Sequence, residues 1–193
     1  MSVSARRALL GLAVTAALFA PITTAATAAA VEHEHHLGIG LGGAALKVDD
    51  KSGMMVGAGG AAHYAYGVTD AFNFVAEYSS AIVALDAKLD NPTTPHTRPS
   101  TIDTAGVGAA YVFDVLRWVP YATLLASGSL LHGGTLDKTL VTGGVQIGLG
   151  LDYKFNFSWA AGVAYRQHMF LTKMSTYPSY SQLFFRVEYA WGR

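Results

Sequence analysis

The chain has 193 residues, no cysteine and a formal net charge of zero. It therefore forms no disulfide scaffold and carries no lipid on an N-terminal cysteine, and its charge gives no reason to expect a nucleic-acid partner. Only 13% of the residues are charged, compared with roughly 25% in ordinary soluble domains. This composition is unusually apolar for a protein surrounded by water.

The N-terminus has the pattern of a secretory signal peptide. A basic pair precedes an apolar stretch at residues 8–20, and Ala28 and Ala30 are the small residues that a signal peptidase requires, with a second cleavage frame two residues earlier. The apolar stretch is too short to anchor the chain in a bilayer. We expect residues 1–30 to be removed and residues 31–193 to form one domain.

The rest of the chain lacks the run of about 18 apolar residues that a membrane helix requires. It contains instead strand-like segments separated by turn residues. A closed barrel is the only β-structure that satisfies every backbone N–H and C=O group in lipid. We therefore predict an all-β fold, an eight-stranded antiparallel up-and-down transmembrane β-barrel, with strands at about residues 35–47, 54–67, 72–85, 101–113, 120–132, 138–153, 157–171 and 180–191.

The predicted connections alternate in length along the chain. Compact turns at residues 67–71, 114–119 and 154–156 follow the second, fourth and sixth strands. The other connections are longer and polar, and the longest, at residues 86–100, contains three prolines. Short turns at one rim and longer loops at the other are typical of an outer-membrane barrel.

The last strand shows the alternation most clearly. Arg186 and Glu188 lie on one face, and the opposite face carries Leu183, Phe185, Val187, Tyr189 and Trp191. A soluble lipocalin-like barrel places the apolar face inside, whereas an outer-membrane barrel turns it toward lipid. An eight-stranded interior is too narrow for many rings, so we favour the membrane barrel. The segment at 120–132 is apolar on both faces, and its inward face stays unassigned.

Two groups of side chains are predicted from these faces. A lumenal ion-pair network is expected for Glu77, Arg166, Arg186 and Glu188, with space for the arginines provided by Gly38, Gly40 and Gly42. The alternative is that these groups are solvated in a water-filled interior. An interfacial aromatic girdle is expected for Tyr66, Phe72, Trp118, Tyr121, Tyr153, Trp159, Tyr189 and Trp191.

The chain resembles the eight-stranded outer-membrane barrels of the OmpA and OmpW type, especially single-domain members. The resemblance covers the whole mature chain and rests on glycine-rich residues 37–43, the turn at 66–72, the stretches at 117–121 and 148–153, and the aromatic last strand. One departure is that Gly192 and Arg193 follow the terminal aromatic residue, where family members commonly end on it.

This resemblance implies a monomer in the cell outer membrane of a Gram-negative bacterium. Its partners would be outer-membrane lipid, lipopolysaccharide and the machinery that assembles outer-membrane proteins. We expect a structural or surface-interaction role, with recognition on the loop at 86–100 and a lumen plugged by polar side chains. The alternative implied by OmpW-like barrels is a narrow, porin-like channel for small or hydrophobic solutes.

The histidines invite a metal or an enzymatic interpretation. His33, His35 and His36 alternate with two glutamates, which is compatible with a weak transition-metal site or with a frayed terminus. His168 with Ser175 or Ser179 is the only nearby pair of base and nucleophile. Because His168 falls on the lumenal face, we expect no lipid-modifying enzyme, no catalytic residue, no bound metal and no cofactor.

Overall fold

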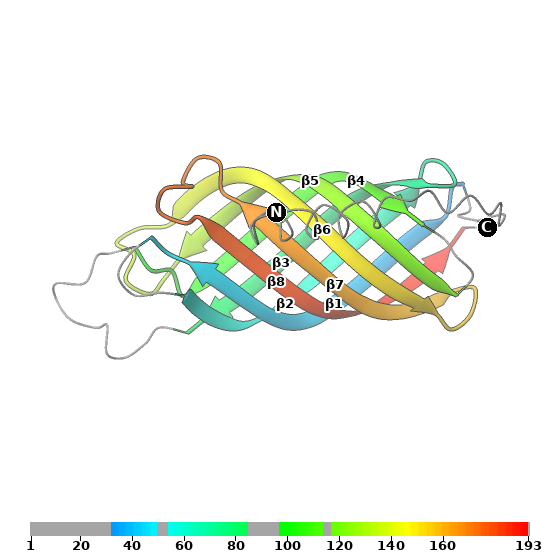
Figure 1. The fold of residues 1–193 in the computed structure, drawn as a ribbon, viewed down its shortest axis with the longest axis horizontal. Coiled ribbons are helices and arrows are strands. Elements are labelled where there is room, and N and C mark those ends of the chain that lie inside the picture. Colours follow the sequence, from blue (N-terminus) through cyan, green and yellow to red (C-terminus); the bar gives the residue numbers. More distant parts are fainter. Residues whose placement is uncertain (1–31, 50–53, 85–96, 114–116, 193) are drawn as a thin grey trace, which may run out of the picture.

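The computed structural model describes residues 32–49, 54–84, 97–113 and 117–192, and these residues contain eight β-strands (Figure 1). Each predicted strand is present, with ends shifted by at most a few residues. No helix in the described residues is long and apolar enough to cross a membrane. The strands are β1 (His35–Lys47), β2 (Met54–Gly67), β3 (Phe72–Val83), β4 (Thr101–Val112), β5 (Trp118–His132), β6 (Leu140–Lys154), β7 (Trp159–Met169) and β8 (Ser179–Trp191).

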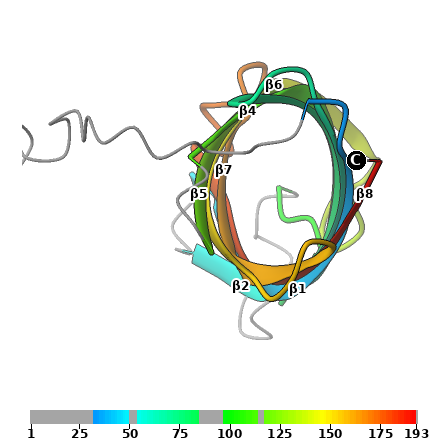
Figure 2. The same cartoon turned by 90° about the vertical axis from the view of Figure 1, so that its right-hand side faces the viewer.

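The sheet closes on itself. Each strand pairs antiparallel with the next one, and β8 pairs with β1, so that Leu41 lies opposite both Gly60 and Phe185. The end view shows one ring of strands around a single interior (Figure 2). Closure leaves no strand edge with unpaired backbone groups.

Side chains alternate between the outer wall and the interior. Ile39 and Phe185 are 67% and 72% exposed, whereas Glu77 and Arg166 are 7% and 2% exposed. A lipocalin-like barrel has the opposite arrangement. The apolar outer wall is also far larger than the patches that soluble monomers leave exposed. The structure therefore has the apolar exterior and charged interior of a membrane barrel.

Strand β5 shows which of its two apolar faces points inward. Val119, Tyr121 and Leu125 are buried, whereas Trp118 and Leu124 are 55% and 60% exposed. The rings of Trp118 and Tyr121, although close to the same rim, therefore lie on opposite faces of the strand. The prediction that Tyr121 joins the aromatic girdle was wrong, because this ring points into the interior.

The two ends of the barrel differ. At the turn end, which joins β2 to β3, β4 to β5 and β6 to β7, short polar side chains organise the backbone. The hydroxyl of Thr69 accepts a hydrogen bond from the N–H of Phe72 at 3.1 Å, and the Asn156 side chain accepts one from the N–H of Trp159 at 2.9 Å. β1 begins and β8 finishes at this end.

At the loop end, the opposite rim, residues from separate connections bind one another. The Tyr177 hydroxyl donates to the carbonyl of Thr97 at 2.7 Å, and the N–H of Thr135 donates to the carbonyl of Arg98 at 2.9 Å. Arg98 is buried, and the green segment before β4 lies within the outline of the ring in Figure 2. Most of the predicted recognition loop at 86–100 lies outside the described residues.

An apolar cluster fills the interior near the loop end. Phe170, Tyr177 and Tyr180 stack and pack edge to face, and all three are almost completely buried. The remaining buried members are Ala44, Leu46, Val48, Met55, Ala81, Val83, Ile102 and Leu131. This half of the interior is packed like the core of a soluble domain, while charged side chains lie nearer the turn end.

Candidate functional site in the barrel interior

The first ion pair of the interior joins β3 to β7. The Arg166 guanidinium donates from Nε to both carboxylate oxygens of Glu77, at 3.1 and 3.0 Å, and from Nη2 to Oε2 at 2.9 Å. Gln146 on β6 donates from Nε2 to Oε1 of the same carboxylate at 2.6 Å. All three side chains are buried, so each charge is paired and hydrogen-bonded, as burial of an ion pair requires.

The second group of charges joins β6 to β8. Arg186 donates from Nε to Oδ1 of Asp152 at 2.9 Å and from Nη2 to Oδ2 of the same carboxylate. Nη2 also lies 3.2 Å from Oε2 of Glu188. The structure thus places the four predicted charges inside the barrel as two neighbouring groups, and it adds Gln146 and Asp152, which the predicted network did not include.

Tyr121 lies between the two arginines. Its ring centroid is 4.3 Å from the Arg186 guanidinium carbon and 5.8 Å from that of Arg166. A cation over an aromatic face is attracted by the ring quadrupole. This ring, which the sequence analysis assigned to the girdle, therefore links the two groups of charges.

Glycines make room for these side chains, and of the three that were predicted to do so Gly40 lies beside an arginine, since a Cβ there would be 3.4 Å from Cβ of Arg186. A Cβ at Gly148 would lie 2.8 Å from Nη1 of Arg166, and one at Gly150 would lie 2.1 Å from the ring of Tyr121. A Cβ at Gly38 would instead lie 2.1 Å from the ring of His63. The space for Arg166 and Tyr121 is thus provided by β6, and Gly38 on β1 makes room for a histidine.

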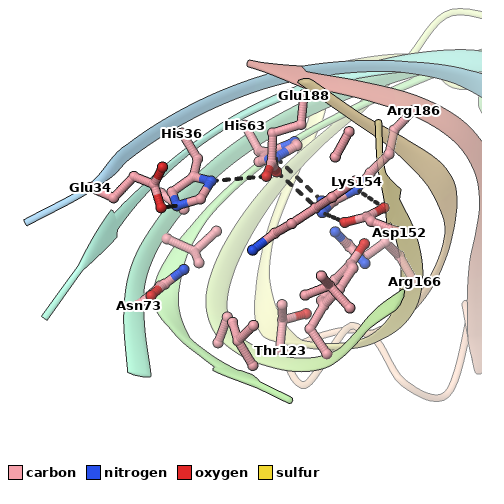
Figure 3. Close-up of a pocket in the computed structure, with 17 residues that line it drawn as sticks. Glu34, His36, His63, Asn73, Thr123, Asp152, Lys154, Arg166, Arg186 and Glu188 are labelled. Carbon is pink, nitrogen blue, oxygen red and sulfur yellow. Dashed lines mark hydrogen bonds and ion pairs between the residues drawn. The ribbon is translucent and has the colours of Figure 1, made fainter. Parts of the chain in front are cut away.

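The side chain of His63, on β2, passes over Gly38, on β1, and contacts β8. Gly38 is paired with His63 on one side and with Glu188 on the other. Nε2 of His63 lies 2.7 Å from Oε2 of Glu188, and Nδ1 of His36 lies 2.9 Å from Oε1. Glu188 therefore ties together β1, β2 and β8 (Figure 3).

A small cavity lies between these groups and the turn end. Its volume is about 70 Å³, and it is lined by Arg166, Asp152, Arg186 and Glu188, by the ring of Tyr121 and by Glu34, His36, Asn73 and Lys154 nearer the rim (Figure 3). This volume holds a few water molecules. The arrangement can bind water and small polar species at one end of the barrel.

Comparison with known proteins identifies the family. Residues 13–190 match the family described as outer membrane protein beta-barrel domain. The chain belongs to this outer-membrane β-barrel family. The protein is accordingly located in the outer membrane of a Gram-negative bacterium, with its turn end toward the periplasm and its loop end outside. No curated protein of known function is significantly similar to it in sequence.

Solved structures share the barrel at low sequence identity. Neisserial surface protein A is 16% identical in sequence and has a TM-score of 0.59, and the match covers 82% of this chain and 99% of the neisserial chain. The N-terminal barrel domain of Pseudomonas aeruginosa OprF is 14% identical with a TM-score of 0.56, covering 83% and 98%. Yersinia pestis Ail, the attachment invasion locus protein, is 13% identical with a TM-score of 0.57, covering 83% and 100%. At these identities the similarity shows the shared fold.

Outward-facing aromatic side chains of this outer-membrane barrel gather at its periplasmic end. Phe72 packs edge to face on Tyr111, Trp118 on Tyr153, and Trp159 lies over Tyr189, which stacks on Trp191. Tyr66 lies at the same rim, beside His35. Of the eight residues assigned to the girdle, the structure places all but Tyr121 on the outer wall at this end.

His35 and His36, the first two residues of β1, point to opposite faces of the strand, and His33 precedes it. Nδ1 of His33 lies 2.7 Å from the hydroxyl of Tyr66, and Nδ1 of His35 lies 2.7 Å from that of Tyr64. His36 points inward to Glu188. The described residues contain no group of three or more acidic, histidine or cysteine side chains placed to hold a metal ion.

His168 lies inside the barrel, away from lipid. It is 1% exposed, and its Nε2 lies 3.0 Å from Oε1 of Gln182. The Ser179 hydroxyl accepts a hydrogen bond from Gln167 at 3.1 Å. His168 and Ser179, which the sequence analysis considered as a base and a nucleophile, therefore bind Gln182 and Gln167 and not each other.

Proposed function

We propose that this barrel has a structural or surface-interaction role in the outer membrane and that its interior is closed to solutes. The supporting observation is that two different fillings follow one another along the interior. The linked charges of Glu77, Arg166, Tyr121 and Arg186 occupy the periplasmic part, and the apolar cluster occupies the external part.

Three further points belong to this proposal. The protein acts as a monomer, reaches the membrane through the outer-membrane assembly machinery and contacts partners through its external loops. It has no catalytic activity, in line with the position of His168 among buried side chains. The proposed role requires no cofactor.

Recordings from the refolded protein in planar lipid bilayers test the closed interior. We expect no steady conductance from the wild type, because both halves of the interior are filled. A double variant with Arg166→Ala and Phe170→Ala removes a large side chain from each half and is expected to conduct. Leu149→Ala, on the outer wall, is the matched control and should stay silent.

Steady conductance from the wild type would contradict the closed interior. It would support the second candidate function, a narrow channel for small or hydrophobic solutes. The cavity of about 70 Å³ near the periplasmic end favours this candidate, because side chains leave this part of the interior unfilled. Heat-modifiable mobility in gels confirms that each variant is folded.

A further inference from the structure

An exposed histidine lies close to the expected N-terminus of the mature chain. Cleavage of the expected signal peptide after Ala30 makes Val31 the first residue and His33 the third. His33 comes two residues before β1 at the periplasmic rim, and it is exposed, as is Glu32. The sequence analysis considered only the side chains of this region and expected no bound metal. Counted from the new terminus, the position of His33 provides a different set of ligands.

A histidine at the third position of a free N-terminus can bind a metal ion through four nitrogens. The ligands are the terminal amine, the backbone nitrogens of the second and third residues, and Nδ1 of the histidine. Neighbouring ligands close five- and six-membered chelate rings, which hold the four nitrogens in one plane. Cu²⁺ and Ni²⁺ prefer such a square-planar set of nitrogens, whereas Zn²⁺ prefers a tetrahedral set.

The structure shows which contacts of His33 must open for this. Its Nδ1 lies 2.7 Å from the hydroxyl of Tyr66, and its N–H donates to the carbonyl of Gly67 at 2.9 Å. Its φ of 70° is the only positive value among the described residues other than glycine, and residues with a side chain rarely adopt it. Both contacts lie at the exposed rim, where water replaces a lost hydrogen bond at little cost.

The barrel itself does not need to move. The N–H of Gly67 donates to the carbonyl of Glu34 at 2.9 Å, and Glu34 is buried. From His35 onward the chain is paired with β2 on one side and with β8 on the other. Only the residues before Glu34 therefore change position when His33 turns from Tyr66 to a metal ion.

We propose that the mature N-terminus, Val31-Glu32-His33, binds one Cu²⁺ ion at the periplasmic rim, and Ni²⁺ more weakly. The ion replaces the proton on the backbone nitrogens of Glu32 and His33, and it binds the amine of Val31 and Nδ1 of His33 in their neutral forms. The two amide protons are released to water, and the two negative charges left on the nitrogens balance the charge of the ion. This site lies outside the barrel and does not depend on whether the interior conducts.

Titration of Cu²⁺ into the protein tests this site. The protein is purified in detergent from outer membranes after natural processing, and its intact mass identifies the first residue. The readouts are the visible absorption and the electron paramagnetic resonance spectrum of a planar four-nitrogen Cu²⁺ complex. We expect one equivalent to bind, to resist an excess of Zn²⁺ and to be released as the pH falls, because the nitrogens are protonated again.

His33→Ala removes one of the four ligands. It should weaken Cu²⁺ binding by more than about a hundredfold, because even the loss of a contact that only supports a metal ligand costs up to this much. His35→Ala is the matched control, since Nδ1 of His35 also lies 2.7 Å from a tyrosine hydroxyl, that of Tyr64. This control should bind Cu²⁺ like the wild type.

A second variant keeps every side chain and changes only the position of the histidine. One alanine inserted between Val31 and Glu32 moves His33 to the fourth position, and the planar spectrum should disappear. Binding that survives this insertion or His33→Ala, or that is lost in His35→Ala, would overturn the proposal. A mature chain that starts at a residue other than Val31 would overturn it as well, because His33 would no longer be third. Heat-modifiable mobility shows that each protein is folded.

Discussion

Gly38 shows how one missing side chain determines the contacts of the interior. His63 occupies the space that a Cβ at this position would take, and from there it contacts Glu188 on the far side of β1. The absence of a side chain on β1 thus allows β2 to bind β8 directly. The barrel closes at the β1–β8 pair, so this contact crosses the seam between the two ends of the chain.

We expect Gly38→Ala to destabilise the barrel. The new Cβ would lie 2.1 Å from Cε1 of His63, so the ring must move and its contact with Glu188 is lost. Overpacking of this kind costs about 1–3 kcal/mol. The measurement is urea unfolding in lipid vesicles, followed by tryptophan fluorescence.

Gly43→Ala is the control on the same strand. A Cβ at Gly43 would have its nearest neighbour at 3.8 Å, the carbonyl oxygen of Gly57, which is ordinary contact. This variant should unfold at the wild-type urea concentration. Equal stability of both variants would show that His63 has no fixed position over β1.

At the scale of the element, β5 is the strand whose orientation the structure had to supply. Its inward residues include Thr123 and Leu125, and its outward residues include Ala122, Leu124 and Ala126. Since the chain contains no cysteine, single cysteines can be introduced along β5 without background labelling.

Spin labels on these cysteines should report alternating contact with lipid. Labels that replace Ala122, Leu124 and Ala126 are expected to collide readily with oxygen dissolved in the membrane. Labels that replace Thr123 and Leu125 should be shielded, because these side chains are buried inside the barrel. Paramagnetic relaxation measurements decide the orientation, and the reverse alternation would contradict the assigned faces.

The strands could be predicted from the sequence because most of them are polar on one face only. Glu77, Arg166 and Arg186 mark the inward face of β3, β7 and β8 without ambiguity. β5 lacks such a mark, since leucines occur on both of its faces. Tyr121 was misassigned for this reason, as a ring near a rim is equally compatible with a girdle and with a cation–π contact.

The partners within the interior could not be predicted from the sequence. Inward positions follow from alternation, but the pairing of Arg166 with Glu77 and of Arg186 with Asp152 depends on where side chains meet across the lumen. The apolar cluster was missed for a different reason. Tyr177 lies in the connection between β7 and β8, where strand periodicity gives no information about direction. Phe170 falls within the strand predicted at 157–171, but it is apolar, and the inward face was identified only by its polar residues.

At the scale of the whole molecule, the decisive feature is that apolar rings point outward and charges point inward. The three tryptophans report on this arrangement directly. Trp118, Trp159 and Trp191 are 55%, 48% and 39% exposed on the outer wall at the periplasmic end. In the membrane these exposed surfaces face lipid at the interface rather than water.

The most direct test of this account is quenching of the intrinsic tryptophan fluorescence by brominated phospholipids. Refolded wild-type protein should be quenched strongly, and more strongly by bromine near the headgroup end of the acyl chain than by bromine near the chain terminus. Water-soluble acrylamide should have little effect. Fluorescence that brominated lipids leave unchanged and acrylamide quenches would contradict the account, because the rings would then face water.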